Sequence, residues 1–395
     1  MRYHQSGKIP QKRHTVFKSD NDKFYYEQLF GTEGFHGISS LLYHIHRPTQ
    51  IKTISKPKDV TPKIAVDKNV TPRMFKGMNV TAEDDFLDSR KILMLNNDLK
   101  MGLAKPKKST DYFYKNAECD ELLFIHEGSG TLKTFVGELK FSVGDYLIIP
   151  RGTIYQVELD TEKNVMLVLE AHSPIYTPKR YRNEFGQLLE HSPFCERDIE
   201  APTFVEPKDE QGEFLIKVKK ENQIWDFIYA THPFDVVGWD GYFYPYKFNI
   251  KNFEPITGRV HLPPPIHQNF EGHNFVVCSF VARLYDYHPL AIPAPYNHSN
   301  IDSDEVLFYT EGDFMSRNHI DLMDFTLHPG GIVHGPHPGA MERSIGKKFT
   351  EEYAVMVDPF RPLKLTEEAL KVEDKTYYAS WLETPENHLG DRSQE

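Results

Sequence analysis

The chain has 395 residues, of which 39% are hydrophobic, enough to build more than one buried core. It carries 57 Asp and Glu against 46 Lys and Arg, which gives a net charge of −11. A surface this acidic argues against general binding to nucleic acid and against attraction to anionic membranes, but it allows a local basic pocket for an anionic small molecule.

Cysteine usage and hydropathy indicate the cellular compartment. Cys119, Cys195 and Cys278 are scattered and form no CxxC motif, which is typical of free thiols in a reducing compartment. No apolar stretch approaches the roughly 18 residues of a membrane span. The basic start, MRYHQSGKIPQKRH, leads into no apolar segment of the kind found in secretory signals. We therefore expect a cytoplasmic protein without a membrane partner.

In chain order, residues 51–80 come first, and their Lys, Pro and Thr content predicts an extended, exposed connection. Residues 172–215 show little periodicity and are predicted to form a crossover between two halves. Helical signals are few, and the clearest is at 366–371, where Thr366 can cap a C-terminal helix with acidic residues in its first turn. Short β-branched and aromatic runs bounded by Gly, Pro or Asp predict strands of a sandwich or barrel, namely ELLFIHEG (121–128), GDYLIIPRG (144–152), NVMLVLEA (164–171) and FVVCSFVARLY (275–285).

An internal repeat is the most informative feature. Residues 116–128 (NAECDELLFIHEG) match residues 300–312 (NIDSDEVLFYTEG) at a constant offset of 184. A second block, DYLIIPRGTIY from residue 145, matches DFTLHPGGIVH from residue 324, and both contain P-x-G-x-x. Two matching blocks in the same order predict a mainly β protein made of two copies of one barrel. We expect the first copy within residues 1–235 and the second within residues 236–395.

The second copy carries a candidate metal site. His298, Glu305 and His334 come from a loop, a strand start and a later strand, and the turn at 329–331 can bring His334 onto a neighbouring strand. Two histidines and one carboxylate on one side of a metal form the facial triad of non-haem Fe(II) oxygenases. Three coordination positions then stay open for substrate and O₂.

The first copy lacks both imidazoles. Its equivalent residues are Tyr114, Glu121 and Tyr155, a set that should not hold Fe(II) well. We therefore expect the first barrel to have kept the fold and lost the metal.

Other histidines have weaker patterns. His44 and His46 would share one strand face, but they lack a third ligand and are predicted to be structural. His337 is predicted to support the site from outside or to lie on the surface. A dioxygenase acting on a phenol needs a base near neutral pH, for which His261 and His328 are the candidates. No GxSxG, GxGxxG or P-loop pattern supports hydrolysis by a triad, dinucleotide chemistry or phosphoryl transfer.

Several segments resemble the homogentisate 1,2-dioxygenases, from about residue 25 to the YYASWLE motif near the C-terminus. They are YYEQLFGTEGF (25–35), VVGWDGYFYPYKFNIKNF (236–253), PYNHSN (295–300), VHGPHPG (333–339) and YYASWLE (377–383). The resemblance implies duplicated cupin barrels of the double-stranded β-helix, or jelly-roll, type. It also implies that Fe(II) and O₂ cleave the ring of homogentisate to 4-maleylacetoacetate, in the breakdown of tyrosine and phenylalanine.

The resemblance also assigns residues. It places the iron ligands at His298, Glu305 and His334, and the acid/base histidine at His261. We expect the substrate to contact Tyr296, Asn300, His328 and Phe314, the first two at positions where the family has a pocket tyrosine and asparagine. The family assembles as trimers that pair into hexamers, so a homo-oligomer is implied.

Two departures from the family pattern leave alternatives open. The family places its carboxylate six residues after the first histidine, where this chain has Asp304, so Asp304 is the alternative to Glu305. Phe314 stands at the position of a substrate-contacting tyrosine, so a related phenol such as gentisate stays an alternative substrate. The substrate carboxylate could pair with Arg317, Arg343 or Lys347. A bicupin that binds a metal or small ligand without turnover is the alternative of another class.

Overall fold

The computed structural model describes residues 2–67, 70–312, 314, 317 and 320–382. Within these residues almost all regular structure is β-strand, and the two α-helices are short: α1 (Ala340–Ser344) and α2 (Glu367–Lys371). No helix in this part of the chain is long and apolar enough to cross a bilayer. The predicted fold class, mainly β with few helices, is confirmed.

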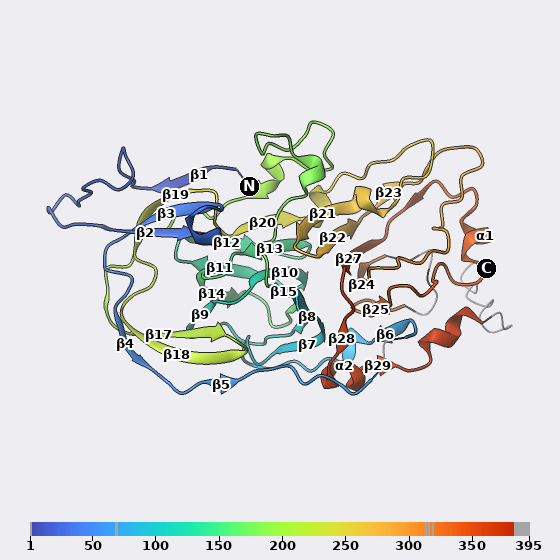
Figure 1. Cartoon of the computed structure of the whole chain (residues 1–395), viewed down its shortest axis with the longest axis horizontal. Coiled ribbons are helices and arrows are strands. Elements are labelled where there is room, and N and C mark those ends of the chain that lie inside the picture. Colours follow the sequence, from blue (N-terminus) through green and yellow to red (C-terminus); the bar gives the residue numbers. More distant parts are fainter. Residues whose placement is uncertain (1, 68–69, 313, 315–316, 318–319, 383–395) are drawn as a thin grey trace.

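Two large sheets form the first barrel, on the left of Figure 1. In spatial order, one consists of β16 (Ile199–Glu200), β20 (Tyr246–Asn249), β13 (Asp145–Ile149), β10 (Asp120–Glu127), β15 (Val165–Ala171), β8 (Leu99–Ala104), β7 (Arg90–Leu95) and β28 (Lys364–Leu365). The other consists of β12 (Gly137–Phe141), β11 (Gly130–Thr134), β14 (Ile154–Leu159), β9 (Phe113–Asn116), β17 (Gln211–Lys220), β18 (Gln223–Thr231) and β4 (Ile51–Ile54), and β5 (Lys58–Asp59) also pairs with β18. Apolar side chains from both sheets share one buried cluster, so the two sheets pack face to face.

The second barrel lies on the right of Figure 1 and is built around one seven-stranded sheet. Its spatial order is β21 (Gln268–Gly272), β22 (Phe275–Phe280), β27 (Tyr353–Pro359), β24 (Glu305–Glu311), β25 (Phe325–His328), β6 (Arg73–Phe75) and β29 (Glu373–Asp374). A small sheet pairs β23 (Arg283–Leu284) with β26 (Phe349–Thr350). A four-stranded sheet at the N-terminal end contains β1 (His4–Gly7), β19 (Val236–Gly241), β3 (Ser39–His44) and β2 (Tyr26–Gly31).

The two barrels exchange strands. From the first half of the chain, β6 pairs with β25 and joins the second barrel. In return, β20 pairs with β13 and β28 pairs with β7 in the first barrel. One large buried cluster includes apolar residues of both halves. The two copies are therefore held together by backbone pairing as well as by packing.

The prediction for residues 51–80 is wrong at its C-terminal end. β4 and β5 are exposed, as expected of a connection, but all three residues of β6 are buried. The side chains of Met74 and Phe75 are apolar and enter the core of the second barrel, where their burial outweighs the polar character of the flanking sequence. The helix predicted near the C-terminus is confirmed as α2, with the Thr366 side chain accepting a hydrogen bond from the Ala369 N–H.

The repeat predicted from the sequence corresponds to equivalent strand pairing. Glu121 on β10 lies opposite Ile149 on β13, and Glu305 on β24 lies opposite His328 on β25. The same offsets, 184 and 179, relate the two pairs of residues. The two barrels therefore have the same strand register at Glu121 and Glu305, the equivalent glutamates of the repeat.

Candidate metal centre

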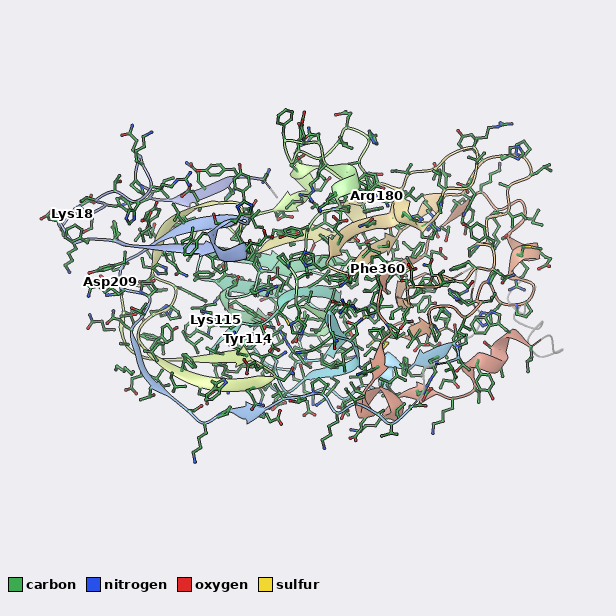
Figure 2. All side chains as sticks on the ribbon, viewed as in Figure 1. Lys18, Tyr114, Lys115, Arg180, Asp209 and Phe360 are labelled. Carbon is green, nitrogen blue, oxygen red and sulfur yellow. The ribbon has the colours of Figure 1, made fainter. Side chains whose placement is uncertain are left out.

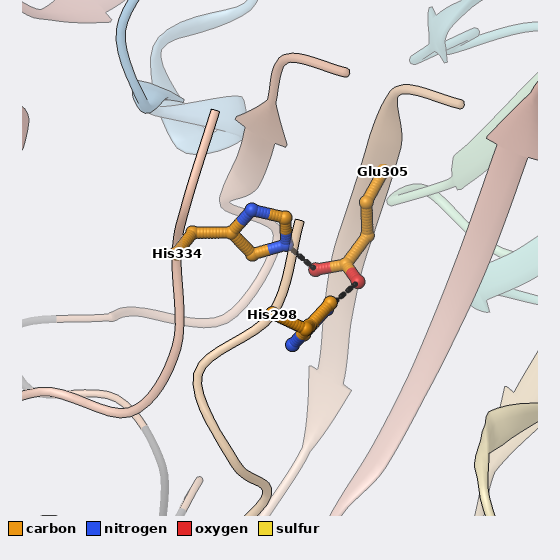
Figure 3. Close-up of side chains that lie close together, drawn as sticks. All are labelled: His298, Glu305 and His334. Atoms are coloured by element: carbon orange, nitrogen blue, oxygen red, sulfur yellow. Dashed lines mark hydrogen bonds and ion pairs between the residues drawn. The ribbon is translucent and has the colours of Figure 1, made fainter. Parts of the chain in front are cut away.

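Three side chains of the second barrel converge as Figure 3 shows. Glu305 is the first residue of β24, whereas His298 and His334 lie in loops. The backbones of the two histidines pair with each other, with N···O distances of 2.8 and 2.9 Å in the two directions. This antiparallel bridge fixes the separation of the two ring centroids at 4.3 Å.

The donor atoms of this set lie close together. All three residues offer atoms within 4.8 Å of one another. The Nε2 atom of His298 is 3.4 Å from Glu305 Oε2, and the Nε2 atom of His334 is 3.7 Å from Glu305 Oε1. His334 is buried, and its Nε2 atom has no hydrogen-bond partner among the residues that the structure describes.

The hydrogen bonds of the two imidazoles determine which nitrogen can bind a metal. His298 Nδ1 lies 3.1 Å from the Tyr296 carbonyl, and His334 Nδ1 lies 3.0 Å from the Ile332 carbonyl. A carbonyl only accepts, so each Nδ1 carries a hydrogen, and each ring presents its Nε2 atom to Glu305. Two imidazole Nε2 atoms and a carboxylate that converge on one point are ligands of the kind that bind a divalent metal, so these residues fit such an ion.

The charge state of Glu305 agrees with this fit. Burial by itself would raise its pKa, but the neighbouring imidazoles of His298, His328 and His334 outweigh burial and hold the pKa well below its ordinary value. A carboxylate that stays ionised while buried is a suitable ligand for a hard or borderline cation.

His328 lies behind the candidate ligands. Its Nδ1 atom is 3.0 Å from Glu305 Oε1, and its ring stacks on His334 with 4.5 Å between centroids and 8° between planes. It is completely buried, and burial lowers its pKa to about 4, so the ring is neutral. In this position it orients Glu305 and supports His334, and it is not among the residues that line the cavity. A substrate contact of His328 stays a prediction.

Asp304, the alternative carboxylate, is bound elsewhere. Its Oδ1 accepts from the Gly330 N–H at 2.7 Å, and its Oδ2 accepts from the Leu363 N–H at 2.7 Å. Neighbouring residues of a strand point to opposite faces, so Asp304 holds two loops while Glu305 faces the histidines. Asp304 has no place in the group of candidate metal-binding residues within the described chain.

A cavity of about 480 Å³ opens beside the candidate metal centre. One wall is the inward face of β24, β27 and β22. Another comes from the Pro-rich stretch at 262–266, and residues from distant segments, including Arg180 and Phe360 (Figure 2), complete the lining. The predicted site residues on its surface are His261, Tyr296, His298, Asn300, Glu305 and Phe314.

His261 is positioned as a base would be. Its Nδ1 atom lies 3.2 Å from Asp286 Oδ2, and its ring contacts the Tyr296 ring edge-on, with 5.0 Å between centroids. The side chain is 44% exposed. Donation of the Nδ1 hydrogen to Asp286 leaves the Nε2 lone pair free to take a proton in the cavity. Nothing in the sequence connected Asp286 with His261, because the two are 25 residues apart in a region without periodicity.

The basic side chains that line the cavity differ in part from the three that the sequence suggested as partners of a substrate carboxylate. Arg317 lines the cavity and donates to the Gly335 carbonyl at 2.8 Å. Arg343 and Lys347 are not among the lining residues. Arg180 and Arg283 do line it, and sequence reasoning missed both because neither lies near a metal-binding motif.

A C-terminal layer supports the loop that carries His334. Trp381, in the 3-10 helix Tyr377–Trp381, donates from Nε1 to the Gly335 carbonyl at 3.1 Å. Its ring stacks on His337 with centroids 4.1 Å apart, and it contacts the edge of His328 at 6.1 Å. This segment is part of the YYASWLE motif, whose last residue, Glu383, lies outside the described residues. The sequence singled out the motif but not its role.

In the first barrel an arginine stands among the equivalent residues. Arg90 Nη1 donates to Glu121 Oε1, and Arg90 Nη2 donates to the Tyr155 hydroxyl at 3.0 Å. The Tyr155 hydroxyl also donates to Glu121 Oε2 at 2.7 Å, and the guanidinium lies 5.3 Å from the centroid of the Tyr114 ring. A buried guanidinium thus takes the position that a metal would take in the second barrel.

Two other groups are held by protein partners. Glu118, Cys119 and Glu170 have donor atoms close together, but Lys100 and Lys219 already pair with both carboxylates. His44 and His46, outside the cavity, bond to the carboxylates of Asp235 and Asp209 at 2.7 and 2.8 Å. These contacts agree with structural roles for the two histidines.

Comparison with known proteins places the chain among relatives. Residues 6–250 match the family model described as Homogentisate 1,2-dioxygenase N-terminal. A protein of Saccharolobus solfataricus named "Putative dioxygenase" is 41% identical over 382 residues, which cover 96% of this chain and 98% of that protein. The homogentisate 1,2-dioxygenase of Arabidopsis thaliana is 28% identical over 295 residues, which cover 69% of this chain and 62% of that enzyme. For the enzyme of Emericella nidulans the values are 26% over 242 residues, 58% of this chain and 52% of the enzyme.

Among solved structures, a cupin 2 conserved barrel domain protein from Leptotrichia buccalis is 9% identical with a TM-score of 0.33. The match covers 75% of this chain and all of that protein. The fold described above rests on the strand pairing of this chain itself.

Proposed function

The chain belongs to the family described as Homogentisate 1,2-dioxygenase N-terminal, a dioxygenase family, and from this membership we propose that it is an Fe(II)-dependent ring-cleaving dioxygenase. The proposed reaction converts homogentisate and O₂ to 4-maleylacetoacetate. The observation that carries the proposal is the convergence of two imidazole Nε2 atoms and one ionised carboxylate beside a cavity that His298 and Glu305 line.

His298, Glu305 and His334 would hold the iron. When bound there, Fe(II) supplies the open coordination positions at which a phenolate oxygen and O₂ can meet, which makes their reaction effectively intramolecular. The protein contributes a fixed geometry: the backbone bridge between the two histidines sets their spacing, and His328 orients Glu305.

His261 would accept the phenol proton at Nε2. Asp286, bonded at Nδ1, fixes the tautomer and stabilises the imidazolium that forms. Tyr296 packs against this ring and would limit its rotation. Replacement of His261 by Ala is expected to lower kcat by about 100- to 10,000-fold while Fe(II) affinity stays the same. Unchanged kcat in that variant would assign the proton transfer to another group.

Substrate selection would fall to the remaining lining residues. Arg317 is the candidate partner for the substrate carboxylate, since it alone of the three basic residues expected from sequence lines the cavity. Tyr296 and Asn300 would border the substrate near the mouth. Phe314 packs its ring 4.5 Å from that of Tyr309 and would offer an apolar contact where a tyrosine would offer a hydroxyl.

The decisive test is product identification. The protein is loaded with Fe(II) without oxygen, mixed with homogentisate and then exposed to O₂, and the product is identified by mass spectrometry. We expect O₂ uptake and a product heavier than homogentisate by two oxygen atoms. A bicupin that only binds ligands would take up no O₂ with any phenol.

The alternative substrate is gentisate or a related phenol, and the absence of a tyrosine hydroxyl at Phe314 is the observation that favours it. A panel of homogentisate, gentisate and hydroquinone at equal concentration ranks the substrates by kcat/KM. A preference for gentisate over homogentisate would change the proposed substrate to gentisate and would not affect the proposed metal ligands.

Two expectations from the resemblance are also part of the proposal: a homo-oligomer, trimeric or hexameric, and a cytoplasmic location. Light scattering coupled to size-exclusion chromatography measures the mass of the assembly. A monomer in that experiment would refute the first expectation, and fractionation of cells tests the second.

A further inference from the structure

A row of four side chains runs across the sheet in each barrel at the level of the glutamate. In the first barrel the row is Ile149, Glu121, Glu170 and Lys100 on β13, β10, β15 and β8. In the second barrel the equivalent strands β25, β24, β27 and β22 carry His328, Glu305, Asp358 and Val276. The pairing of Val306 with Val357 on one side, and the Asp304 N–H donating to the Pro359 carbonyl on the other, puts Glu305 directly opposite Asp358.

The residue opposite the glutamate on the neighbouring strand is acidic in both barrels, Glu170 in the first and Asp358 in the second. Within the described residues, basic side chains pair with this acid in the first barrel only. In the first barrel Glu170 Oε1 accepts from Arg90 at 3.1 Å, Glu170 Oε2 accepts from Lys219, and the Lys100 ammonium is 3.8 Å from the same carboxylate. In the second barrel Val276 replaces the lysine of the row. Among the described residues the Asp358 side chain makes no hydrogen bond or ion pair, and its Oδ1 atom is buried without a partner.

Asp358 faces the cavity. It is one of the lining residues, together with Met356 and Ala354 of the same strand, as expected from alternation along β27. Directly opposite residues of an antiparallel pair have Cβ atoms about 5 Å apart, so the Asp358 carboxyl group lies beside that of Glu305. A buried carboxyl oxygen without a partner is unfavourable, and it becomes favourable when a ligand supplies the missing hydrogen.

We propose that Asp358 is a specificity-determining residue that accepts a hydrogen bond from the ring hydroxyl of a bound diphenol, the hydroxyl that the metal does not hold. This inference rests on the proposed function for the identity of the ligand, and it deepens that function by assigning the residue that distinguishes a diphenol from a monophenol. The side chain contacts substrate only, and the metal ligands remain His298, Glu305 and His334.

The test measures binding without turnover. Fe(II)-loaded protein is titrated calorimetrically, without oxygen, with homogentisate and with 2-hydroxyphenylacetate, which lacks the second ring hydroxyl. We expect wild type to bind homogentisate roughly tenfold more tightly than the monophenol, the factor that one hydrogen bond to a carboxyl group contributes. In Asp358→Val this ratio falls to about one, whereas Asp358→Asn, which keeps an accepting oxygen, retains most of it.

Controls separate this role from a structural one. Asp302→Val removes one negative charge from an exposed position outside the cavity lining, three residues before Glu305, and should leave the ratio at its wild-type value. Fe(II) affinity of each variant is measured by competition with a chromogenic chelator. If Asp358→Val weakens Fe(II) binding and both phenols equally, or keeps the wild-type ratio, the proposal is refuted.

The outcome is independent of ring cleavage. If wild type discriminates between the two phenols, Asp358→Val loses this discrimination, and no ring-opened product forms with O₂, the proposed activity fails and the role of Asp358 stands. If wild type cleaves homogentisate but binds the monophenol equally well, the proposed activity stands and Asp358 has no role in specificity. Wild type that binds neither phenol would refute both the diphenol class and the role of Asp358.

Discussion

The two barrels surround their equivalent glutamates, Glu121 and Glu305, with different groups. In the first, the guanidinium of Arg90 bonds both Glu121 and Tyr155. In the second, Glu305 faces the Nε2 atoms of two imidazoles, and no arginine bonds it among the residues that the structure describes. A buried glutamate needs a positive charge nearby in either case. The first barrel supplies the charge from its own chain, whereas the second leaves a place for one from solution.

The difference shows how one barrel of a duplicated fold can hold a buried glutamate without a bound ligand. An internal cation makes Glu121 part of the core, and no ligand is required. The second barrel gives up that stabilisation and gains an open site next to a cavity. Each prediction below changes one side of this comparison.

The largest effect is expected from removing the charge of Glu305. Glu305→Gln should weaken Fe(II) binding by more than about 100-fold and abolish ring cleavage. This loss exceeds the one expected when a residue that only hydrogen-bonds to a metal ligand is removed. Asp304→Asn is the matched variant, because it removes the adjacent carboxylate. It should keep Fe(II) binding and lower the free energy of unfolding by about 1–3 kcal/mol, since Asp304 accepts two backbone hydrogen bonds. Anaerobic Fe(II) titration of both variants measures their metal affinity. Loss of Fe(II) binding in Asp304→Asn with binding retained in Glu305→Gln would assign the ligand role to Asp304.

The next effect concerns the first barrel. Arg90→Met removes the cation and leaves Glu121 buried without compensation, which should lower the free energy of unfolding by about 3–5 kcal/mol. Lys91→Met, at the next residue, removes a partly exposed pair with Glu83 and an exposed hydrogen bond to the Asp88 carbonyl, and it should change the free energy of unfolding by about 1 kcal/mol at most. Chemical denaturation measures both. Equal stability of the two variants would show that Arg90 does not stabilise the first barrel.

An intermediate effect is expected at the position opposite the glutamate. His328→Ile copies Ile149 of the first barrel and removes the hydrogen bond that orients Glu305. Fe(II) affinity should fall by about 10- to 100-fold with the three ligands intact. Competition with a chelator quantifies the loss. Wild-type affinity in this variant would mean that the backbone alone orients Glu305.

The smallest effect is expected in the C-terminal layer. Trp381→Phe keeps an aromatic ring against His337 and loses the hydrogen bond to the Gly335 carbonyl, which should lower stability by about 1 kcal/mol. Tyr378→Phe, in the same short helix, changes an exposed residue and serves as the control. Thermal unfolding compares the two, and a shift no larger than that of the control would remove Trp381 from the support of the His334 loop.

Much of the fold was predictable because the two repeat blocks coincide with strands that have a clear hydrophobic pattern. The matching blocks predicted which strands correspond, and the strand registers at Glu121 and Glu305 agree with that prediction. Strand β6 was missed because its three residues lie in a Lys- and Pro-rich segment, where composition indicates a connection. Only the partner sheet makes those residues a strand, since the backbone hydrogen bonds that stabilise it come from β25.

The candidate site was predictable in its ligands and not in its partners. Glu305 matches Glu121 of the first copy, whereas His298 and His334 stand where the first copy has Tyr114 and Tyr155, and such a difference within a repeat is visible in one sequence. Asp286 beside His261 and Arg180 on the cavity have no counterpart in the repeat. Their proximity to the site depends on how loops cross the barrel, which local patterns do not specify.

The sequence by itself determined the β-rich class, the duplication and the asymmetry between the copies, because strand periodicity and residue identity are properties of short segments. The tertiary structure alone decided that Arg90 neutralises Glu121, that β6 belongs to the other barrel, and that Asp358 lies beside Glu305 with no cation paired to it in the described part of the chain. Each of these depends on contacts between segments far apart in the chain, where packing and burial select the partner and local preference does not.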